Sequence, residues 1–348
     1  MDIAVTPMDP ADDKAVEQAY QIVEAVLAAD VPDFPPVGRQ RFLAELRHPW
    51  PATAFERALA TVDGEGVGFV VIEMPQLDNL DNAEVDLSVH PEHRRRGVGR
   101  ALYEYAQDVI QSVGRKRAMG MSVETLPGGA VRDEAGAGFA IAMGAKGALT
   151  DVRRRLDVTS VDEAGLERQL AAAWERAAGY SLVQWRGATP EEIIDDIAYL
   201  DGRLLTDAPM GELDWEAEKI DADRIRAIDA VVAARGRRRY NTAVRHDESG
   251  RVVAFTTIDF PGTVDWHAFQ QITIVDPTHR GHRLGTVVKL ENLGYTRAHE
   301  PGLRAIDTWN ADVNDHMISI NEAMGFRAVD GWQNWQHDLS GVPAATSA

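Results

Sequence analysis

The chain has no cysteine among its 348 residues. This absence excludes disulfide bonds, thiolate metal ligands and a cysteine nucleophile. The sequence also lacks an apolar run near the roughly 18 residues that a membrane-spanning helix needs. Its first residues have neither the basic nor the apolar stretch of a secretory signal. We therefore expect a soluble protein of the cytoplasm.

Basic residues are scarce relative to acidic ones. The sequence has 36 Lys and Arg against 55 Asp and Glu, a formal net charge of −19. Such a charge disfavours nucleic acid and anionic membranes as partners and would help to attract cationic small molecules such as amines. The length is comfortable for two domains. We expect a two-domain monomer or homodimer with no nucleic-acid or membrane partner.

One stretch joins a predicted strand, a basic turn rich in glycine and the start of a helix. Residues 84–89 alternate between polar and apolar, and Pro91 ends the strand. Apolar side chains then recur with helical spacing over residues 98–113. Gly97 and Gly99 therefore stand at a helix N-terminus, where backbone N–H groups have no intrahelical partner. With arginines on both sides of the glycines, the turn predicts a site for phosphate or pyrophosphate.

Two other interpretations of this turn compete with the anion site. A dinucleotide-binding turn would have the pattern Gly-x-Gly-x-x-Gly, and the third glycine is missing here. The other interpretation is a basic strand-to-helix turn exposed to solvent. The agreement of strand, proline, arginines and helical period favours the anion site.

The same pattern occurs a second time in the chain. Pro91 and Pro277 are separated by 186 positions, as are Arg94 and Arg280 and also Gly99 and Gly285. Predicted strands and helices precede both turns in a similar order. The sequence therefore predicts an internal duplication.

The Arg-x-x-Gly-x-Gly turn of Arg94, Gly97 and Gly99 resembles the coenzyme A loop of the GNAT N-acetyltransferase superfamily. In the second half, Asn314 begins a predicted helix that ends at Gly325-Phe326. That helix resembles the one beside the coenzyme A arm in the same superfamily. The resemblance covers nearly the whole chain as two tandem copies, in a layout similar to the mycothiol synthase-like tandem acetyltransferases.

This resemblance implies an α/β (α+β) protein with two tandem GNAT-like acyl-CoA N-acyltransferase domains. Each is expected to be a mixed, mostly antiparallel splayed sheet flanked by helices. From the sequence we place the N-terminal domain at residues 1–157, a connecting helix at 158–179 and the C-terminal domain at 180–339. Residues 340–348 are expected to form a disordered tail.

The resemblance also implies which residues bind acetyl-CoA as a co-substrate, with no metal. In the first copy these are Val89, Arg94, Arg95, Arg96, Gly97, Val98, Gly99 and Arg100. In the second copy they are Val275, Arg280, Gly281, His282, Arg283, Leu284, Gly285, Asn310 and Asn314. Arg283 stands where Gly97 stands, so we expect weaker coenzyme A binding in the second copy.

Acetyl transfer to an amine needs a route for the amine's proton. Glu84 is the first candidate for the catalytic base and Asp86 is its nearest rival, since both lie on one face of the predicted strand upstream of the turn. Alternatively, they are carboxylates of an ordinary solvent-facing strand. In the second copy these positions are Gln270 and Ile272, and His267 or Asp265 would have to substitute.

The tyrosine that often protonates the leaving thiolate in this superfamily is missing. Its position falls on Ala140 in the first copy and on Asn321 in the second. The expected function is an N-acetyltransferase that moves an acetyl group directly from acetyl-CoA to the amine of a small molecule. The alternative is a non-catalytic acyl-CoA-binding or regulatory tandem GNAT pseudoenzyme. Arginine-rich runs at 115–117, 153–155 and 237–239 are expected to be solvated and without a role in the site.

Overall fold

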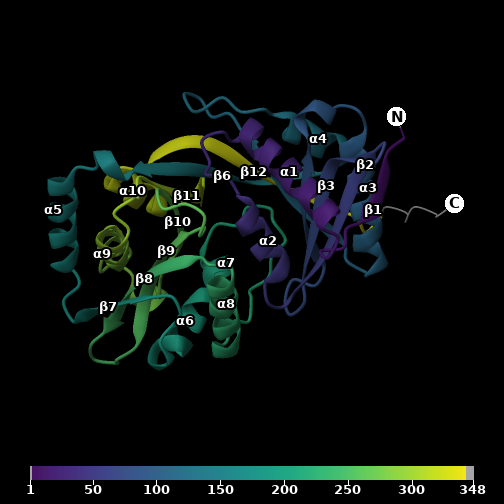
Figure 1. Cartoon of the computed structure of the whole chain (residues 1–348). Helices are drawn as coiled ribbons and strands as arrows, with labels where there is room; N and C mark the ends of the chain where they lie inside the picture. Colours follow the sequence, from purple (N-terminus) through teal and green to yellow (C-terminus); the bar gives the residue numbers. More distant parts are fainter. Residues whose placement is uncertain (1, 342–348) are drawn as a thin grey trace. The chain divides into compact units, whose positions relative to one another are not determined.

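The computed structural model describes residues 2–341 (Figure 1). Most of the predicted tail, residues 342–348, lies outside the described residues. The chain divides into two compact units. The first contains residues up to Asp151, Met210–Trp215 and residues from Asp330 onward, and the second contains Val152–Pro209 and Glu216–Val329.

The first unit has a six-stranded mixed sheet in the order β1-β2-β3-β4-β5-β12. All neighbours in it are antiparallel except β4 and β5, which are parallel. Its elements in chain order are β1 (Ala4–Pro7), α1 (Asp13–Asp30), α2 (Arg39–Arg47), β2 (Thr53–Val62), β3 (Glu65–Pro75), β4 (Asn82–Val89), α3 (Val98–Ser112), β5 (Arg117–Glu124), α4 (Ala135–Ala142) and, at the chain's end, β12 (Arg327–Asp338).

Helices cover both faces of this sheet. Val70 and Ile72 of β3 pack with α3, whereas Phe69 and Val71 pack with α1 and α2. Neighbouring residues of a strand point to opposite faces, so α3 covers one face and α1 and α2 the other.

The second unit repeats the plan with the order β6-β11-β10-β9-β8-β7. Strands β7 to β10 are antiparallel neighbours, and β10 and β11 are parallel. Its elements are β6 (Lys146–Asp157), α5 (Glu163–Trp174), β7 (Tyr180–Arg186), α6 (Ile194–Asp201), α7 (Leu204–Asp207), α8 (Ala222–Ala234), β8 (Arg238–His246), β9 (Val252–Phe260), β10 (His267–Val275), α9 (Leu284–His299), β11 (Ala305–Ala311) and α10 (Asp315–Met324). The predicted fold class of two mixed, mostly antiparallel sheets flanked by helices is confirmed.

The unit boundaries differ from the contiguous division at 1–157 and 180–339. Strand β12 pairs with β5 from Gly331 opposite Glu124 to Asp338 opposite Arg117, and so completes the first unit. Strand β6 begins in the first unit and belongs to the second from Val152. Pairing satisfies the backbone groups of the β5 edge, and such a long-range partner leaves no local pattern in the sequence.

The segment 158–179 is part of the second unit and not a separate connector. Within it, α5 spans Glu163–Trp174, and its Leu166 and Leu170 pack against the core of the second unit. The Trp174 Nε1 donates a hydrogen bond to Glu291 Oε1 of α9 over 2.7 Å. These contacts fix the helix on its own unit.

The arginine run 153–155, expected to be solvated, is largely buried. Arg153 is 0% exposed and its Nη1 lies 3.0 Å from Asp307 Oδ2, while Arg155 Nε lies 2.6 Å from Asp307 Oδ1. His267 Nε2 lies 3.0 Å from the same carboxylate. The expectation was wrong because β6 lies beside β11 in the sheet, which brings its arginines to the buried Asp307.

The other two arginine runs are also paired inside the protein. Arg237 and Arg239 both contact the buried Asp259, over 2.7 and 3.0 Å. Arg115 is buried, and its Nη1 donates to the Asn82 carbonyl over 2.7 Å. Sequence alone could not show that these runs lie on strands and turns with buried acceptors.

We predict that Asp307→Asn destabilises the protein by about 3–5 kcal/mol, because it leaves a buried arginine without its counter-charge. Burial alone would raise the pKa of Asp307, but hydrogen bonds from Arg155 and His267 outweigh it and hold the pKa below its usual value. The stabilisation is therefore present above the unfolded-state pKa and is lost as the pH falls toward the folded-state value. Urea unfolding at neutral pH measures the loss.

The matched control is Asp312→Asn, which changes an exposed aspartate just after β11. Its expected effect on the free energy of unfolding is within about 0.5 kcal/mol. Equal small effects of both variants would show that the Asp307 network contributes no net stability.

Candidate active site

The two parallel strands at the centre of the first unit diverge along their length. Their paired residues run only from Asn82 opposite Arg117 to Glu84 opposite Met119. Strand β4 continues to Val89 and β5 to Glu124, and each keeps its antiparallel partner on the other side. The edge of β4 beyond Glu84 is therefore available to a polar ligand lying between the strands. We call this opening the first wedge.

A turn at the C-terminal end of the first wedge leads into α3. After a 3₁₀ turn at Pro91–His93, Arg95 and Gly97 adopt left-handed backbone conformations with φ of 61° and 91°. Helix α3 then begins at Val98 with no side-chain hydrogen bond at its N-cap. Its first N–H groups are thus available to an anion, as the glycine spacing predicted.

Three arginines of this turn are exposed cations. Arg95, Arg96 and Arg100 are exposed and form no ion pair among the described residues. Together with the helix N-terminus, they make a positive surface in a protein of formal charge −19. This arrangement suits a phosphate or pyrophosphate group.

Arg94 differs from the other arginines of the turn. Its Nη1 and Nη2 donate to the two carboxylate oxygens of Asp30, each over 2.8 Å, and Nη1 also donates to Asp133 over 2.9 Å. Its Nε donates to the Val89 carbonyl over 3.3 Å. The side chain predicted to hold coenzyme A is thus occupied by protein groups, which could not be foreseen because Asp30 and Asp133 are distant in sequence.

The two candidate bases lie on the face of β4 that α1 and α2 cover. Val85 and Leu87 pack against the core under α3, so Glu84 and Asp86 point to the opposite face, and both are exposed. Although the Asp86 side chain reaches solvent, the protein surrounds its carboxyl closely enough that desolvation, and then the like charge of Glu45, raise the pKa of Asp86 above its usual value. A raised pKa brings a carboxylate closer to the range that suits a general base.

A hydroxyl group that sequence reasoning missed lies beneath α4. Tyr103 of α3 is buried, and its hydroxyl lies 2.8 Å from His337 Nδ1 on β12. The Tyr103 ring also meets the Phe139 ring of α4 edge-on, with centroids 6.0 Å apart. Burial raises the pKa of Tyr103 to about 12, so it is protonated at neutral pH. The superfamily pattern places the tyrosine at Ala140 on α4. Tyr103 is distant from Ala140 in sequence, so only the fold shows that its ring lies beside α4.

The second unit has a wedge and a turn of the same design. Strands β10 and β11 pair only from His267 opposite Ala305 to Phe269 opposite Asp307. The two residues that correspond to Arg95 and Gly97 are Gly281 and Arg283, with φ of 90° and 58°. Each turn therefore needs two left-handed residues and has glycine at only one of them.

Arg283 takes the place of Gly97 in the second turn and adopts the same left-handed conformation, at a cost of about 1–2 kcal/mol. Weaker coenzyme A binding in this copy stays a prediction. Arg283 is exposed and forms no ion pair among the described residues. Gly285, in the first turn of α9, has only ordinary contacts where a Cβ would stand.

Other side chains of the second turn are occupied. Arg280 Nη2 lies 2.9 Å from Asp207 Oδ2, and His282 Nδ1 lies 3.3 Å from the Arg176 carbonyl. The position of Glu84 is taken by Gln270, which is buried and donates to Thr256 Oγ1 and the Thr257 carbonyl, each over 2.8 Å. These bonds leave the amide fixed inside the sheet.

The remaining base candidates of the second copy are poorly placed. Ile272 packs into the core, and His267 is 0% exposed with Asp307 as its partner. Asp265 is exposed in the loop before β10. The second unit thus has no exposed carboxylate at the strand positions where the first unit has two.

The asparagines predicted to hold the cofactor in the second copy make internal hydrogen bonds. Asn314 caps α10 by accepting from the Met317 N–H over 3.3 Å. Asn310 Oδ1 accepts from Asn321 Nδ2 over 2.6 Å, and Asn321 is fully buried. Asn321, which stands at the superfamily's tyrosine position, is therefore part of a buried amide pair.

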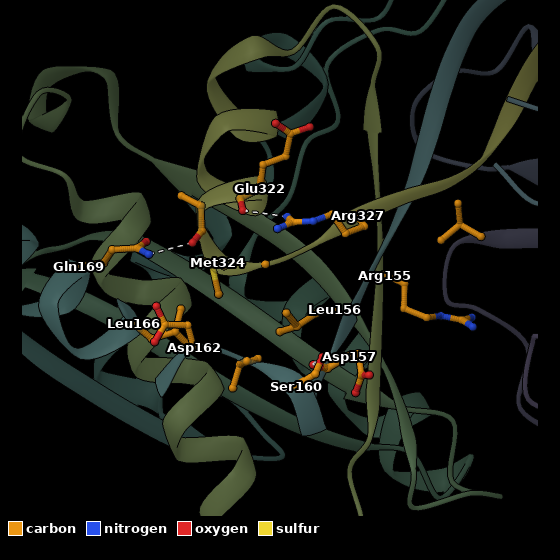
Figure 2. Close-up of a pocket in the computed structure, with 14 residues that line it drawn as sticks. Arg155, Leu156, Asp157, Ser160, Asp162, Leu166, Gln169, Glu322, Met324 and Arg327 are labelled. Atoms are coloured by element: carbon orange, nitrogen blue, oxygen red, sulfur yellow. Dashed lines mark hydrogen bonds between the residues drawn. The ribbon is translucent and has the colours of Figure 1, made fainter. Parts of the chain in front are cut away.

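A recess of about 600 Å³ lies elsewhere in the second unit (Figure 2). It is bounded by the start of α5 and the end of α10, and none of the predicted site residues lines it. Figure 2 shows Gln169 and Arg327 bonded to backbone carbonyls of α10, over 2.8 Å to Ala323 and 3.2 Å to Glu322. Because these polar groups are already satisfied, we assign the recess no catalytic role.

Within residues 2–341, no group of three or more His, Asp or Glu side chains is arranged to hold a metal ion. In the same range, no helix has the length and apolar character needed to cross a membrane.

Comparisons with known proteins agree with the fold and the turn. Residues 23–126 match the model of the acetyltransferase (GNAT) family. No curated protein sequence matches the chain. Among solved structures, a tandem GNAT protein from the clavulanic acid biosynthesis pathway is 31% identical, with a TM-score of 0.81, over 98% of this chain and 100% of that one.

Two further structures share the fold at low identity. A GCN5-related N-acetyltransferase from Sphaerobacter thermophilus is 13% identical with a TM-score of 0.65, over 99% of this chain and 98% of that one. A glucosamine N-acetyltransferase region of a fungal multi-domain GH3 β-N-acetylglucosaminidase is 14% identical with a TM-score of 0.66, over 97% of this chain and 38% of that one. Identity and coverage against the clavulanic acid pathway protein establish that the chain belongs to the GNAT acetyltransferase family, in its tandem form.

Proposed function

We propose that the protein is an N-acetyltransferase that transfers an acetyl group directly from acetyl-CoA to the amine of a small molecule. The observation that carries this proposal is the first wedge ending in an uncapped helix N-terminus, beside three arginines that form no ion pair among the described residues. A pyrophosphate at α3 and a pantetheine arm along the edge of β4 from which β5 has diverged fit this arrangement. The proposed setting is the cytoplasm, with no nucleic-acid, membrane or metal partner.

Asp86 is the proposed base for the amine's proton, with Glu84 as its alternative. Both carboxylates lie on the face of β4 opposite α3, which directs them toward an acceptor on the α1 and α2 side. The raised pKa of Asp86 favours it, because a stronger base accepts the proton more readily. The acidic protein would also concentrate cationic amines near the site.

The chemistry is proposed for the first unit. Its turn has three arginines without an ion pair among residues 2–341, and its strand has two exposed carboxylates. The second unit has Gln270 and Ile272 at the positions of these carboxylates. We propose that the second unit binds a second coenzyme A without turnover or serves to support the first.

A second candidate function is acyl-CoA binding without catalysis. The observation that favours it is Ala140, which has no hydroxyl to protonate the leaving thiolate. Direct transfer can still proceed if the thiolate takes its proton from water or from the substrate ammonium.

Release of free thiol from acetyl-CoA separates the two functions. With a panel of small amines and a thiol-reactive dye, we expect release that depends on the amine and follows saturation kinetics. Coenzyme A binding without amine-dependent release across the panel would favour the non-catalytic function.

A further inference from the structure

Arg94 stands at the mouth of the first wedge and joins the elements on its two sides. It follows β4, and it contacts Asp30 at the end of α1 and Asp133 in the segment between β5 and α4. Its side chain is 19% exposed and that of Asp30 is 23% exposed, so the pair is largely shielded from water. Two parallel N–H···O bonds to one carboxylate are a strong and directional arrangement.

The same side chain covers a backbone group that a ligand would need. His90 donates its N–H to the Val67 carbonyl of β3. In a strand, the carbonyl of one residue and the N–H of the next point to opposite edges. The Val89 carbonyl therefore faces the other edge of β4, from which β5 has diverged. Arg94 Nε occupies the Val89 carbonyl there, over 3.3 Å.

We infer that Arg94, held by Asp30 and Asp133, is an autoinhibitory latch that closes the first wedge until an acyl-CoA displaces it. This inference rests on the proposed function, because it assumes that the arm of acyl-CoA lies along β4. Displacement frees the Val89 carbonyl for a pantetheine amide and leaves the Arg94 cation near the pyrophosphate. The apparent dissociation constant is then the intrinsic one divided by the fraction of molecules in which the latch is open, so a closed latch lowers the apparent affinity.

Weakening the latch should therefore speed and strengthen binding. We expect Asp30→Asn to raise the association rate constant and the affinity for coenzyme A roughly five-fold, because a neutral amide holds the guanidinium less firmly. Asp133→Asn should act in the same direction with a smaller effect, since Asp133 is 50% exposed and contributes one bond. Stopped-flow and calorimetric titration with coenzyme A measure both quantities.

The matched control is Asp81→Asn. Asp81 contacts Lys116 over 2.9 Å and lies just before β4, at the opposite end of that strand from Val89. Asp81→Asn removes the same charge as Asp30→Asn, so it measures any general electrostatic gain in the binding of an anionic ligand. We expect Asp30→Asn to exceed this control by about five-fold in rate.

Equal changes in Asp30→Asn and Asp81→Asn, or weaker binding in Asp30→Asn with an unchanged melting temperature, would overturn the latch. Should Asp30→Asn fail to fold, Asp133→Asn alone decides between the same outcomes. Absence of coenzyme A binding by the wild type and by every variant would instead contradict the proposed function. The two failures are therefore distinguishable.

Discussion

Gly97→Val is expected to weaken acetyl-CoA binding by the first unit by roughly 10²-fold and to remove turnover. Gly97 has a φ of 91° and directly precedes α3. Its surroundings are open, since only Ile3 comes near the place where a Cβ would stand, at 3.6 Å. The penalty therefore comes from the backbone and not from a clash. A β-branched residue in this conformation costs about 1–3 kcal/mol, or the turn must rearrange and misalign the N–H groups.

The second unit supplies a matched control for this variant. Gly281 has a φ of 90° and belongs to the corresponding turn, and apart from its own chain neighbours no described residue comes within 4 Å of the place where its Cβ would stand. Gly281→Val therefore imposes the same backbone penalty on the other copy. We expect it to retain turnover, with coenzyme A stoichiometry showing which site is lost. Loss of activity in Gly281→Val alone would move the chemistry to the second unit.

Asp86→Asn is expected to lower turnover at neutral pH by roughly 10²-fold, the usual contribution of a general base. The amide keeps the shape of the side chain and removes its basicity. Because desolvation raises the pKa of Asp86, wild-type turnover should increase with pH through a value above the ordinary 3.8. That acidic limb of the pH profile should be absent in Asp86→Asn.

Glu84→Gln separates the two candidate carboxylates. Glu84 lies two residues earlier on the same face of β4, opposite Glu73 of β3. If Asp86 is the base, Glu84→Gln keeps the acidic limb and most of the turnover. A roughly 10²-fold loss in Glu84→Gln with little loss in Asp86→Asn would assign the role to Glu84.

The fold and the geometry of the glycine-containing turn were predictable because their signals are local. Alternation over residues 84–89, Pro91 and the glycines of the turn specify a strand, its end and a helix N-terminus within a few residues. Because the same pattern recurs 186 positions later, the same local structure could be predicted for the second half. The structure gives both turns matching left-handed residues, which supports that prediction.

What the sequence could not provide depends on contacts between distant residues. Buried Arg153 pairs with Asp307 of β11. Arg94 pairs with Asp30 and Asp133, both of which are distant from it in sequence. Tyr103 meets His337 across more than half of the chain. Local sequence patterns carry no information about such partners. A run of charged residues on a buried strand therefore has the same sequence pattern as a run on the protein surface.

Transfer of a labelled acetyl group shows whether the protein moves acetyl from acetyl-CoA to an amine. The protein is incubated with acetyl-CoA carrying a deuterated acetyl group and with each amine that supports thiol release, and the products are weighed by mass spectrometry. If the proposed function is correct, wild type and Gly281→Val yield an amine that carries the labelled acetyl group, and Gly97→Val yields none. Label that stays on coenzyme A, or appears only as acetate, would contradict it.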